Sequence, residues 1–484
     1  MMTGRLHFFL VFTFFAFALG GIPALKSTIN QSGLNKIREV AMSILRQQLT
    51  SIALPDIHGK TGTPIGDINY DLTRLVLNNI NFGDSAISTV SGKGVDVKLV
   101  GISCHVALNW HYSTWLASDS GSADVTIRNT NIEVAVDVGA ANERPTITVS
   151  GVGVYIGDMS IDIHGGASWL YQIFVNIFQG QIKDAVQDAL RGAVTDTINE
   201  QAKDFLSTLP IDEPVDSVSM IDVGLEMTPT FTPSSLTTAH LGEFYSIKNP
   251  QECPSAHHTL PDSTTDEMVE MVLDPFLINS ASFVYWANGG MMYDLEDKDV
   301  PPESPVRLNT TDFQDMIPNL YNAYPDRLMH LHLQADQYPE VTVDSDGIQG
   351  AMVASINVSV ILPSGLAHVF TLGGVVNVAG EVHCDGEKIR GKVSFLSAQI
   401  KLSETVIGDF DVEPLQDIVD FLCTMGALPA LNQYLANGFD VPSAEGVSLI
   451  NPKIAYGPGY ITISADLDYK PTIKTHAHNW DVSL

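Results

Sequence analysis

Two histidines separated by one residue, His330 and His332, are the strongest candidates in the chain for metal chemistry. On a β-strand, residues two apart face the same side, as two ligands of one metal ion must. No cysteine or carboxylate at ligand spacing accompanies them, although Asp336 is near. We therefore interpret the pair as part of a solvated strand face, and His257-His258 and His476-x-His478 in the same way.

Other catalytic and ligand-binding patterns are missing. The acidic run over residues 294–299 lacks the central Gly and terminal Glu of a calcium loop and predicts a solvated loop. The sequence has no Gly-x-Ser-x-Gly, no phosphate-binding glycine loop, no His-Glu-x-x-His and no Cys-x-x-Cys. The prediction is a protein that is not an enzyme and has no metal or cofactor. A lipid hydrolase assembled from scattered Ser, His and Asp residues is the alternative that a serine-reactive probe would reveal.

The negative net charge argues against two classes of partner. The 484 residues include 25 Lys and Arg against 56 Asp and Glu, a formal net charge of −31. Nucleic acids and anionic lipid headgroups attract positively charged proteins, so neither is an expected partner. Because 45% of residues are hydrophobic and only 17% charged, we expect a large core or apolar surfaces that meet something other than water.

The first residues have the layout of a secretory signal peptide. Arg5 and His7 precede an apolar run at residues 8–19, and small residues follow it. This run is too short to span a bilayer. We therefore expect residues 1–21 to be removed and the protein to be secreted.

Secretion bears on glycosylation and on the cysteines. Sequons for N-glycosylation stand at Asn30, Asn309 and Asn357. Four cysteines in an oxidising compartment favour two disulfides, but four cysteines allow three pairings and spacing does not choose among them. These are Cys104, Cys253, Cys384 and Cys423.

Hydrophobic periodicity predicts the same order of elements in each half of the chain. Helical patterns cover residues 32–54 (capped by Ser32), 169–209, 266–276, 312–321 and 412–439, the last interrupted at 426–429. Alternating patterns predict strands over residues 61–159, 282–293, 354–401 and 461–467, with a change of phase near Asn129. The stretch 217–246 is strand-like and lies between the two halves.

The helix over residues 169–209 requires a curled partner. Its apolar residues recur every four positions, and each such step drifts about 40° around an α-helix. A straight rod on a flat sheet cannot bury a stripe that circles the helix. We expect the sheet to curl around it, aided by a break at Gly180 or Gly192.

Local strings in order along the mature chain resemble the family of bactericidal/permeability-increasing protein, lipopolysaccharide-binding protein and the plasma lipid transfer proteins. They include Ile52-Ala53-Leu54-Pro55-Asp56, Pro145-Thr146-Ile147-Thr148, Trp169-Leu170, Thr208-Leu209-Pro210, Asp216-Ser217-Val218, Gly242-Glu243-Phe244-Tyr245-Ser246, Leu415-Gln416-Asp417-Ile418 and Asn437-Gly438-Phe439. The resemblance implies an α+β fold, an elongated two-barrel boomerang. Each barrel is a twisted antiparallel sheet wrapped around a long helix, and a central antiparallel sheet joins the two.

The boundaries that follow are a first barrel over residues 22–215, a central sheet over 216–248 and a linker over 249–265. The second barrel covers 266–442, return strands to the central sheet cover 443–470, and a polar tail covers 471–484. The resemblance also implies an apolar pocket for acyl chains in each barrel, near the central sheet. The candidates for lipid contact are Ile44, Leu45, Leu49, Trp169, Ile173, Ile177, Phe276, Leu415, Ile418, Val419 and Leu422.

Two features depart from the family pattern. The family's disulfide between a strand and the long helix is absent, because Val149 and Val152 occupy the strand and no cysteine lies near Arg191. The hairpin at the tip of the first barrel carries a basic cluster in lipopolysaccharide-binding members, but residues 109–120 here contain no Lys or Arg. The tip offers four apolar or aromatic residues for membrane docking: Trp110, Tyr112, Trp115 and Leu116. Cross-strand packing is the equally weighted alternative for this hairpin.

The sequence thus predicts a secreted lipid-binding or lipid-transfer protein that holds phospholipid-like acyl chains in apolar pockets, one per barrel. Bound lipid is the ligand, and a neutral membrane or lipoprotein surface is the expected partner. An innate-immune protein that binds lipopolysaccharide is the alternative. The lipid class, disulfide pairing, oligomeric state and any protein receptor do not follow from the sequence.

Overall fold

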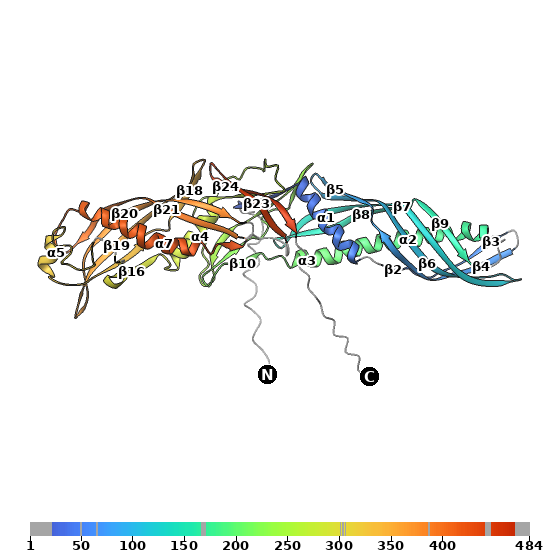
Figure 1. Ribbon diagram of the computed structural model, residues 1–484, viewed down its shortest axis with the longest axis horizontal. Coiled ribbons are helices and arrows are strands. Elements are labelled where there is room, and N and C mark those ends of the chain that lie inside the picture. The colour runs from blue at the N-terminus through green and yellow to red at the C-terminus, as the bar shows by residue number, and fades with distance from the viewer. Residues whose placement is uncertain are drawn as a thin grey trace, which may run out of the picture.

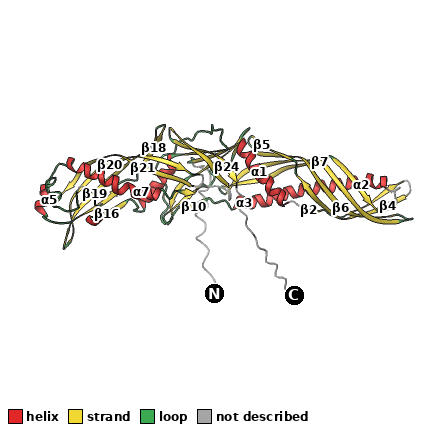
Figure 2. Cartoon of the chain, viewed as in Figure 1, coloured by secondary structure: helices red, strands yellow, loops and turns green. Residues whose placement is uncertain are grey.

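Two barrels and an intervening sheet follow one another along an elongated molecule, with α5 (Pro318–Ala323) near one end and the hairpin of β3 (Ile57–Thr63) and β4 (Gly66–Asn81) near the other (Figure 1). The computed structural model describes residues 22–48, 51–63, 66–165, 171–300, 302, 304, 306–385, 388–440 and 447–469. The predicted leader, Leu49, Trp169 and the polar tail lie outside these ranges. Runs of strands are separated by helices, as in the predicted α+β fold (Figure 2).

The first barrel is built on one antiparallel sheet with order β2-β4-β6-β7-β8, onto which β3, β5 and β9 pair. Its other strands are β2 (Ser51–Ala53), β5 (Asp84–Val90), β6 (Gly94–Ser113), β7 (Ser118–Ala141), β8 (Arg144–Tyr155) and β9 (Asp158–His164). On β6, every second residue from Ile102 to Tyr112 is at most 4% exposed. The strands predicted over residues 61–159 are therefore confirmed, and one face of their sheet is apolar.

The predicted change of strand phase near Asn129 is also confirmed. Along β7, Ile127 and then Ile132 are buried, so the inward-facing side changes parity between them. Asn129 has a φ of +55°, and the register with β6 shifts between Ile102 and Cys104. This bulge keeps both parts of β7 facing the core.

Helix α1 (Gln31–Gln48) is shorter than the helix predicted over residues 32–54, because β2 follows it and pairs with β4. Asn30, and not Ser32, caps this helix. The Asn30 Oδ1 accepts hydrogen bonds from the backbone N–H groups of Ser32 at 2.9 Å and Gly33 at 3.1 Å. The Asn30 Nδ2 donates to the backbone carbonyl of Asp266 at 3.1 Å, which ties the start of α1 to the second half of the chain.

The long helix of the first barrel consists of α2 (Tyr171–Asp196), a π-helical turn (Thr197–Ala202) and α3 (Lys203–Ser207). Its residues at steps of four, Phe178, Ile182, Val186 and Leu190, are all at most 4% exposed. The predicted break at Gly180 or Gly192 is wrong, because α2 continues through both. The interruption is the π-helical turn, where the helix widens and its apolar stripe is reoriented.

The second barrel has a seven-stranded sheet with order β16-β17-β19-β20-β21-β22 and β18 paired to β19. Its strands are β16 (Met292–Glu296), β17 (Met329–Ala335), β18 (Glu340–Asp344), β19 (Gly347–Leu362), β20 (Gly365–Cys384), β21 (Lys388–Thr405) and β22 (Phe439–Asp440). Its second helix comprises a 3₁₀ turn (Glu413–Leu415), α6 (Gln416–Leu422), a π-helical turn (Cys423–Ala427) and α7 (Leu428–Leu435). The predicted interruption at 426–429 is thus confirmed.

Two sheets join the barrels. The six-stranded central sheet has the order β12-β13-β1-β15-β24-β23, and a three-stranded sheet has the order β10-β11-β14. The strands are β1 (Leu25–Asn30), β10 (Asp212–Pro214), β11 (Ser219–Asp222), β12 (Thr230–Thr232), β13 (Ser235–His240), β14 (Glu243–Ser246), β15 (Val269–Leu273), β23 (Val447–Gly457) and β24 (Tyr460–Tyr469). The sequence-based boundaries had placed β1 and β15 in the barrels, but both strands belong to the central sheet.

The elements predicted just after the linker are exchanged. The segment predicted as helix (266–276) contains β15, whose five residues are all buried, and the segment predicted as strands (282–293) mostly continues α4 (Pro275–Ala287). The side chain of Asp274 caps α4 by accepting from the backbone N–H of Phe276 at 2.9 Å. Pro275 occupies the first helical turn, where its missing N–H costs nothing.

Candidate functional site

An apolar cavity lies in the second barrel between α6 and the inner face of the sheet. Its volume is about 40 Å³, and every residue of its wall is apolar. The sheet contributes Met329 and Leu331 from β17, Ile356 and Val358 from β19, and Phe370 and Leu372 from β20. Small-molecule sites usually measure about 300–1,000 Å³, so an acyl chain fits only if a wall of this cavity moves.

The helical wall is formed by Leu415 and by three residues of α6: Ile418, Val419 and Leu422. Their spacing of three, four and seven places them on one face of the helix. Leu415, Ile418 and Val419 are at most 9% exposed. These are the four residues of this helix that the sequence selected for lipid contact. The structure brings all four to one cavity, and their contact with lipid stays a prediction.

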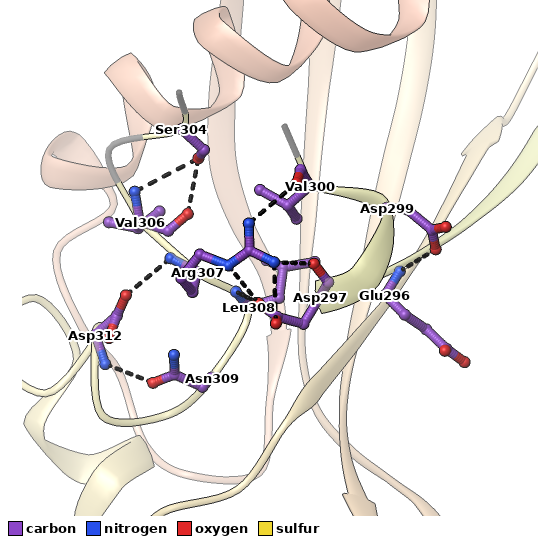
Figure 3. Close-up of polar contacts among 10 residues, drawn as sticks. All are labelled: Glu296, Asp297, Asp299, Val300, Ser304, Val306, Arg307, Leu308, Asn309 and Asp312. Carbon is purple, nitrogen blue, oxygen red and sulfur yellow. Dashed lines mark hydrogen bonds and ion pairs between the residues drawn. The ribbon is translucent and has the colours of Figure 1, made fainter. Parts of the chain in front are cut away.

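The loop residues Leu308 and Phe313 form another wall of the cavity. Arg307 makes several of the polar contacts that hold this loop (Figure 3). The Arg307 Nε lies 3.0 Å from the Asp297 Oδ1, and the Arg307 Nη1 donates to the backbone carbonyl of Val300 at 3.0 Å. The next residue, Leu308, donates its backbone N–H to Asp297 Oδ1 at 2.9 Å and lines the cavity. The Arg307 guanidinium holds the pKa of Asp297 below its usual value. We refer to Arg307 with Asp297 as the Arg307 clasp.

Two further hydrogen bonds hold the same loop around Leu308. Asp312 Oδ2 accepts from the backbone N–H of Arg307 at 2.8 Å, and Asn309 Oδ1 accepts from the backbone N–H of Asp312 at 2.9 Å (Figure 3). Phe313, the next residue, is also part of the cavity wall. The loop wall is therefore set by polar contacts outside the cavity.

Beyond the helical wall, α7 makes more hydrogen bonds to the rest of the chain than α6 does. Asn432 of α7 exchanges two hydrogen bonds with the backbone of Val393, at 2.7 and 2.8 Å. Tyr434 donates to Asp216 Oδ2 at 2.6 Å. On α6, the Gln416 Nε2 donates to the backbone carbonyl of Ala398 at 3.0 Å. The π-helical turn between the two helices carries none of the buried residues of this segment.

The cavity lies away from the central sheet, and the expectation of an acyl-chain pocket near that sheet stays a prediction. Its wall residues belong to a core cluster that also contains Ile317 and Leu320, next to and within α5. The central sheet packs on a separate cluster that includes Leu273 and Ile463. Phe276 is not a wall residue: it is 2% exposed and stacks on the His257 ring with a centroid distance of 3.7 Å. Its contact with lipid stays a prediction.

The candidates in the first barrel fall where the structure gives no side chains. Ile44 and Leu45 are on α1, and Ile173 and Ile177 are on α2, but the positions of these side chains lie outside the described part of the chain. Their role in a first pocket stays a prediction.

The four proposed docking residues of the tip hairpin fall into a buried pair and an exposed pair. Trp110 and Tyr112 are 2% and 4% exposed, and their rings stack at 6.1 Å. The Trp110 Nε1 donates to the backbone carbonyl of Ser122 at 3.0 Å. Trp115 and Leu116, in the turn, are 78% and 71% exposed. Trp110 and Tyr112 are therefore core residues and not docking residues, because their strand positions face inward.

The histidine pair contacts a carboxylate from a neighbouring strand. Asp294 Oδ1 lies 2.7 Å from His332 Nδ1 and 3.3 Å from His330 Nε2. The predicted solvated loop at 294–299 is corrected, because residues 294–296 lie on β16 and 297–299 form a 3₁₀ turn. Within the described ranges, no group of three or more His, Cys, Asp or Glu residues is arranged to hold a metal ion.

The four cysteines are unpaired in the structure, so neither of the two predicted disulfides is seen. Cys104 is 1% exposed in the core of the first barrel, whereas Cys253, Cys384 and Cys423 belong to the linker and the second barrel. Burial raises the pKa of Cys104 to about 11.

Of the predicted glycosylation sites, Asn30 and Asn357 use their side chains within the fold. The Asn30 Nδ2 bonds to Asp266, and the Asn357 Oδ1 accepts from the Thr371 hydroxyl at 2.8 Å. No helix in the described segments is long and apolar enough to cross a membrane.

Comparisons with known proteins agree with this architecture. Residues 33–209 match the N-terminal domain of the LBP / BPI / CETP family, and residues 213–469 match its C-terminal domain. The chain is 28% identical to bactericidal permeability-increasing protein of Sebastes schlegelii over 92% of its own length and 95% of that protein. It is 26% identical to human lipopolysaccharide-binding protein, over 93% and 95% of the two chains.

A solved structure supports the fold independently. The crystal structure of lipopolysaccharide binding protein superposes with a TM-score of 0.63 at 24% identity, covering 92% of this chain and 99% of that chain. The two barrels, the central sheets and the long helices are thus shared features. The chain belongs to the LBP / BPI / CETP family, whose members are lipid-binding proteins and not enzymes.

Proposed function

We propose that this protein is a secreted lipid-transfer protein that takes phospholipid-like acyl chains from a neutral membrane or lipoprotein surface into its barrels. The observation that carries the proposal is the cavity under α6, whose wall is entirely apolar. An apolar cavity in a water-surrounded barrel offers nothing to a polar substrate, whereas each methylene buried from water stabilises a bound chain by about 0.8 kcal/mol.

The cavity as described is too small for an acyl chain. Its volume of about 40 Å³ is close to that of a single water molecule. Loading therefore requires α6, which has fewer hydrogen bonds to the sheet than α7, to move away from the strands. The headgroup would stay at the mouth of the opened cavity, in water.

The charge supports a neutral rather than an anionic donor surface. The formal net charge is −31, and the exposed residues of the tip turn, Trp115 and Leu116, are apolar. Trp side chains favour the interface of a bilayer. A docking tip of this kind needs no phosphate-binding cation.

Two measurements test the proposal. Mass spectrometry of the purified protein should find co-purified acyl lipid, and the protein should accelerate transfer of a fluorescent phosphatidylcholine between vesicles. Absence of both would exclude a lipid carrier.

Lipopolysaccharide binding is the second candidate, because two relatives carry names that describe binding of lipopolysaccharide or killing of bacteria. Binding to immobilised lipopolysaccharide at physiological salt decides between the two. Tight binding that weakens with added salt would favour the second candidate, since anionic glycolipids are held mainly by charge.

A further inference from the structure

Three exposed aliphatic side chains lie at the outer end of the second barrel. Leu328, Leu366 and Val406 are 52%, 57% and 63% exposed. Leu328 precedes β17, Leu366 begins β20 after the turn from β19, and Val406 follows β21. Single exposed aliphatic residues are ordinary on protein surfaces, so their mutual position decides whether they form a surface.

Backbone contacts place Leu328 at the start of β17 and Leu366 on β20, on either side of β19, and Val406 at the end of β21, beside β20. Ile361 of β19 donates its backbone N–H to the carbonyl of Leu328 at 2.9 Å and is the register partner of Leu366. Val406 donates its backbone N–H to the carbonyl of Val369, three residues beyond Leu366, at 3.0 Å. We call Leu328, Leu366 and Val406 the distal rim.

The distal rim borders the cavity. Leu328 is followed by Met329, a wall residue that is 1% exposed, and the backbone partner of Val406 is followed by Phe370, a wall residue that is 2% exposed. Met329 also donates its backbone N–H to the carbonyl of Leu308, a third wall residue, at 2.9 Å. Leu328 thus directly precedes one wall residue of the cavity, and Val406 is hydrogen-bonded to the residue that precedes another.

We infer that the distal rim is a docking surface for a zwitterionic lipid bilayer and that acyl chains reach the cavity from this end of the second barrel. The inference rests on the proposed lipid-carrier function. Aliphatic side chains continuous with an apolar cavity fit hydrocarbon, which requires no directional contacts. Within three residues of the rim in sequence lie three acidic residues, Asp326, Glu404 and Asp409, and one cation, Arg327. Because the excess is acidic, a phosphatidylcholine surface is favoured over an anionic one.

The test uses the full mature chain carrying Trp115→Ala, which removes the exposed tryptophan at the opposite tip. Asn309 forms a β-bridge with Leu328 and is a predicted glycosylation site, so all proteins are enzymatically deglycosylated. The rim variant is Leu328→Gln/Leu366→Gln/Val406→Gln. The matched control is Val100→Gln/Val353→Gln/Leu396→Gln, three residues that are 50%, 39% and 56% exposed elsewhere on the barrels.

We measure flotation with phosphatidylcholine vesicles, the rate of loading with fluorescent phosphatidylcholine, and the amount of lipid bound at saturation. The rim variant should lose at least tenfold in vesicle binding and loading rate, with unchanged lipid at saturation, while the control triple variant behaves as its parent. The single variant Leu366→Gln lies beside a turn and should lose about threefold in vesicle binding and loading rate. It provides the test if the triple variant misfolds.

Two results would overturn the inference in different ways. If the parent carries lipid and the rim variant loads as fast as the control, the distal rim is not the docking surface. The proposed lipid-carrier function would then be unaffected. A wild-type protein that neither floats with vesicles nor binds lipid would remove both.

Discussion

The hydroxyl of Tyr434, on α7, donates a hydrogen bond to Asp216 Oδ2 at 2.6 Å across 218 positions of the chain. Tyr285 of α4 donates to the same oxygen at 2.9 Å. Asp216 precedes β11, so one carboxylate joins two helices of the second barrel to the sheets between the barrels. This contact fixes α7, which continues the helical wall beyond the π-helical turn, to the region between the barrels.

The first prediction concerns the acid stability that this carboxylate provides. Burial acts to raise the pKa of Asp216, but hydrogen bonds from Tyr434, the backbone of Val218 and Ser219, and Tyr285 outweigh burial and hold the pKa at about 2. A carboxyl with a lowered pKa stabilises the fold above its unfolded value of about 3.9, and this stabilisation is lost as the pH falls towards 2.

Asp216→Asn should therefore lower the free energy of unfolding by about 1 kcal/mol at pH 7. In urea titrations, the difference from wild type should shrink between pH 4 and pH 2. A difference that is the same at every pH would show that the charge of Asp216 has no part in stability.

The sequence predicted the periodic parts of the fold and failed where a local signal competed with periodicity. Strand alternation located β19 and the bulge at Asn129, because one buried face imposes a two-residue period. Residues 266–276 were predicted helical because β15 is buried on both faces and shows no alternation. The Asp274-Pro275 pair was the available sign that a helix begins at this point.

The candidate site was predictable only on its helical side. Leu415, Ile418, Val419 and Leu422 share a helical face that the sequence displays directly. Leu308 and Phe313 reach the cavity from a loop, and no periodicity marks a loop residue as buried. Trp110 was misassigned because composition drew attention to the aromatic hairpin, whereas strand parity, counted from the buried residues of β6, would have placed it inside.

The second prediction fills the cavity. Val358 is 3% exposed and lines the cavity, whereas Val353, on the same strand, is 39% exposed. Val358→Phe should occupy the space near α6, reduce the lipid bound per molecule at least threefold, and cost about 1–3 kcal/mol through overpacking. Lipid content is measured by mass spectrometry and stability by urea unfolding. Val353→Phe is the control, and equal lipid in both folded variants would place the lipid elsewhere.

The third prediction opens the loop wall. Arg307→Gln removes the ion pair with Asp297 and the bond to the Val300 carbonyl, so backbone hydrogen exchange should rise over residues 306–313 and at Met329. The global free energy of unfolding should fall by about 1 kcal/mol or less, because the pair is partly exposed. Lipid loading should become faster. Lys298→Gln, which breaks an exposed contact with Glu296, is the control. Unchanged hydrogen exchange over residues 306–313 in Arg307→Gln would show that the Arg307 clasp does not hold this loop.

The fourth prediction separates the two tryptophans of the tip hairpin. Trp110→Ala should destabilise the first barrel by about 3–5 kcal/mol, because it empties a buried site. Trp115→Ala should leave stability unchanged and reduce binding to phosphatidylcholine vesicles. Thermal unfolding and vesicle flotation measure the two effects. Full vesicle binding by the Trp115 variant would exclude this residue from docking.

Native mass spectrometry of the secreted, purified protein tests the central claim most directly. The account predicts a mass above that of the polypeptide and its glycans, from acyl lipid that is released on unfolding and is diminished in Val358→Phe. A protein with no bound lipid that also fails to take up phosphatidylcholine from vesicles would contradict the claim that this cavity is a lipid site.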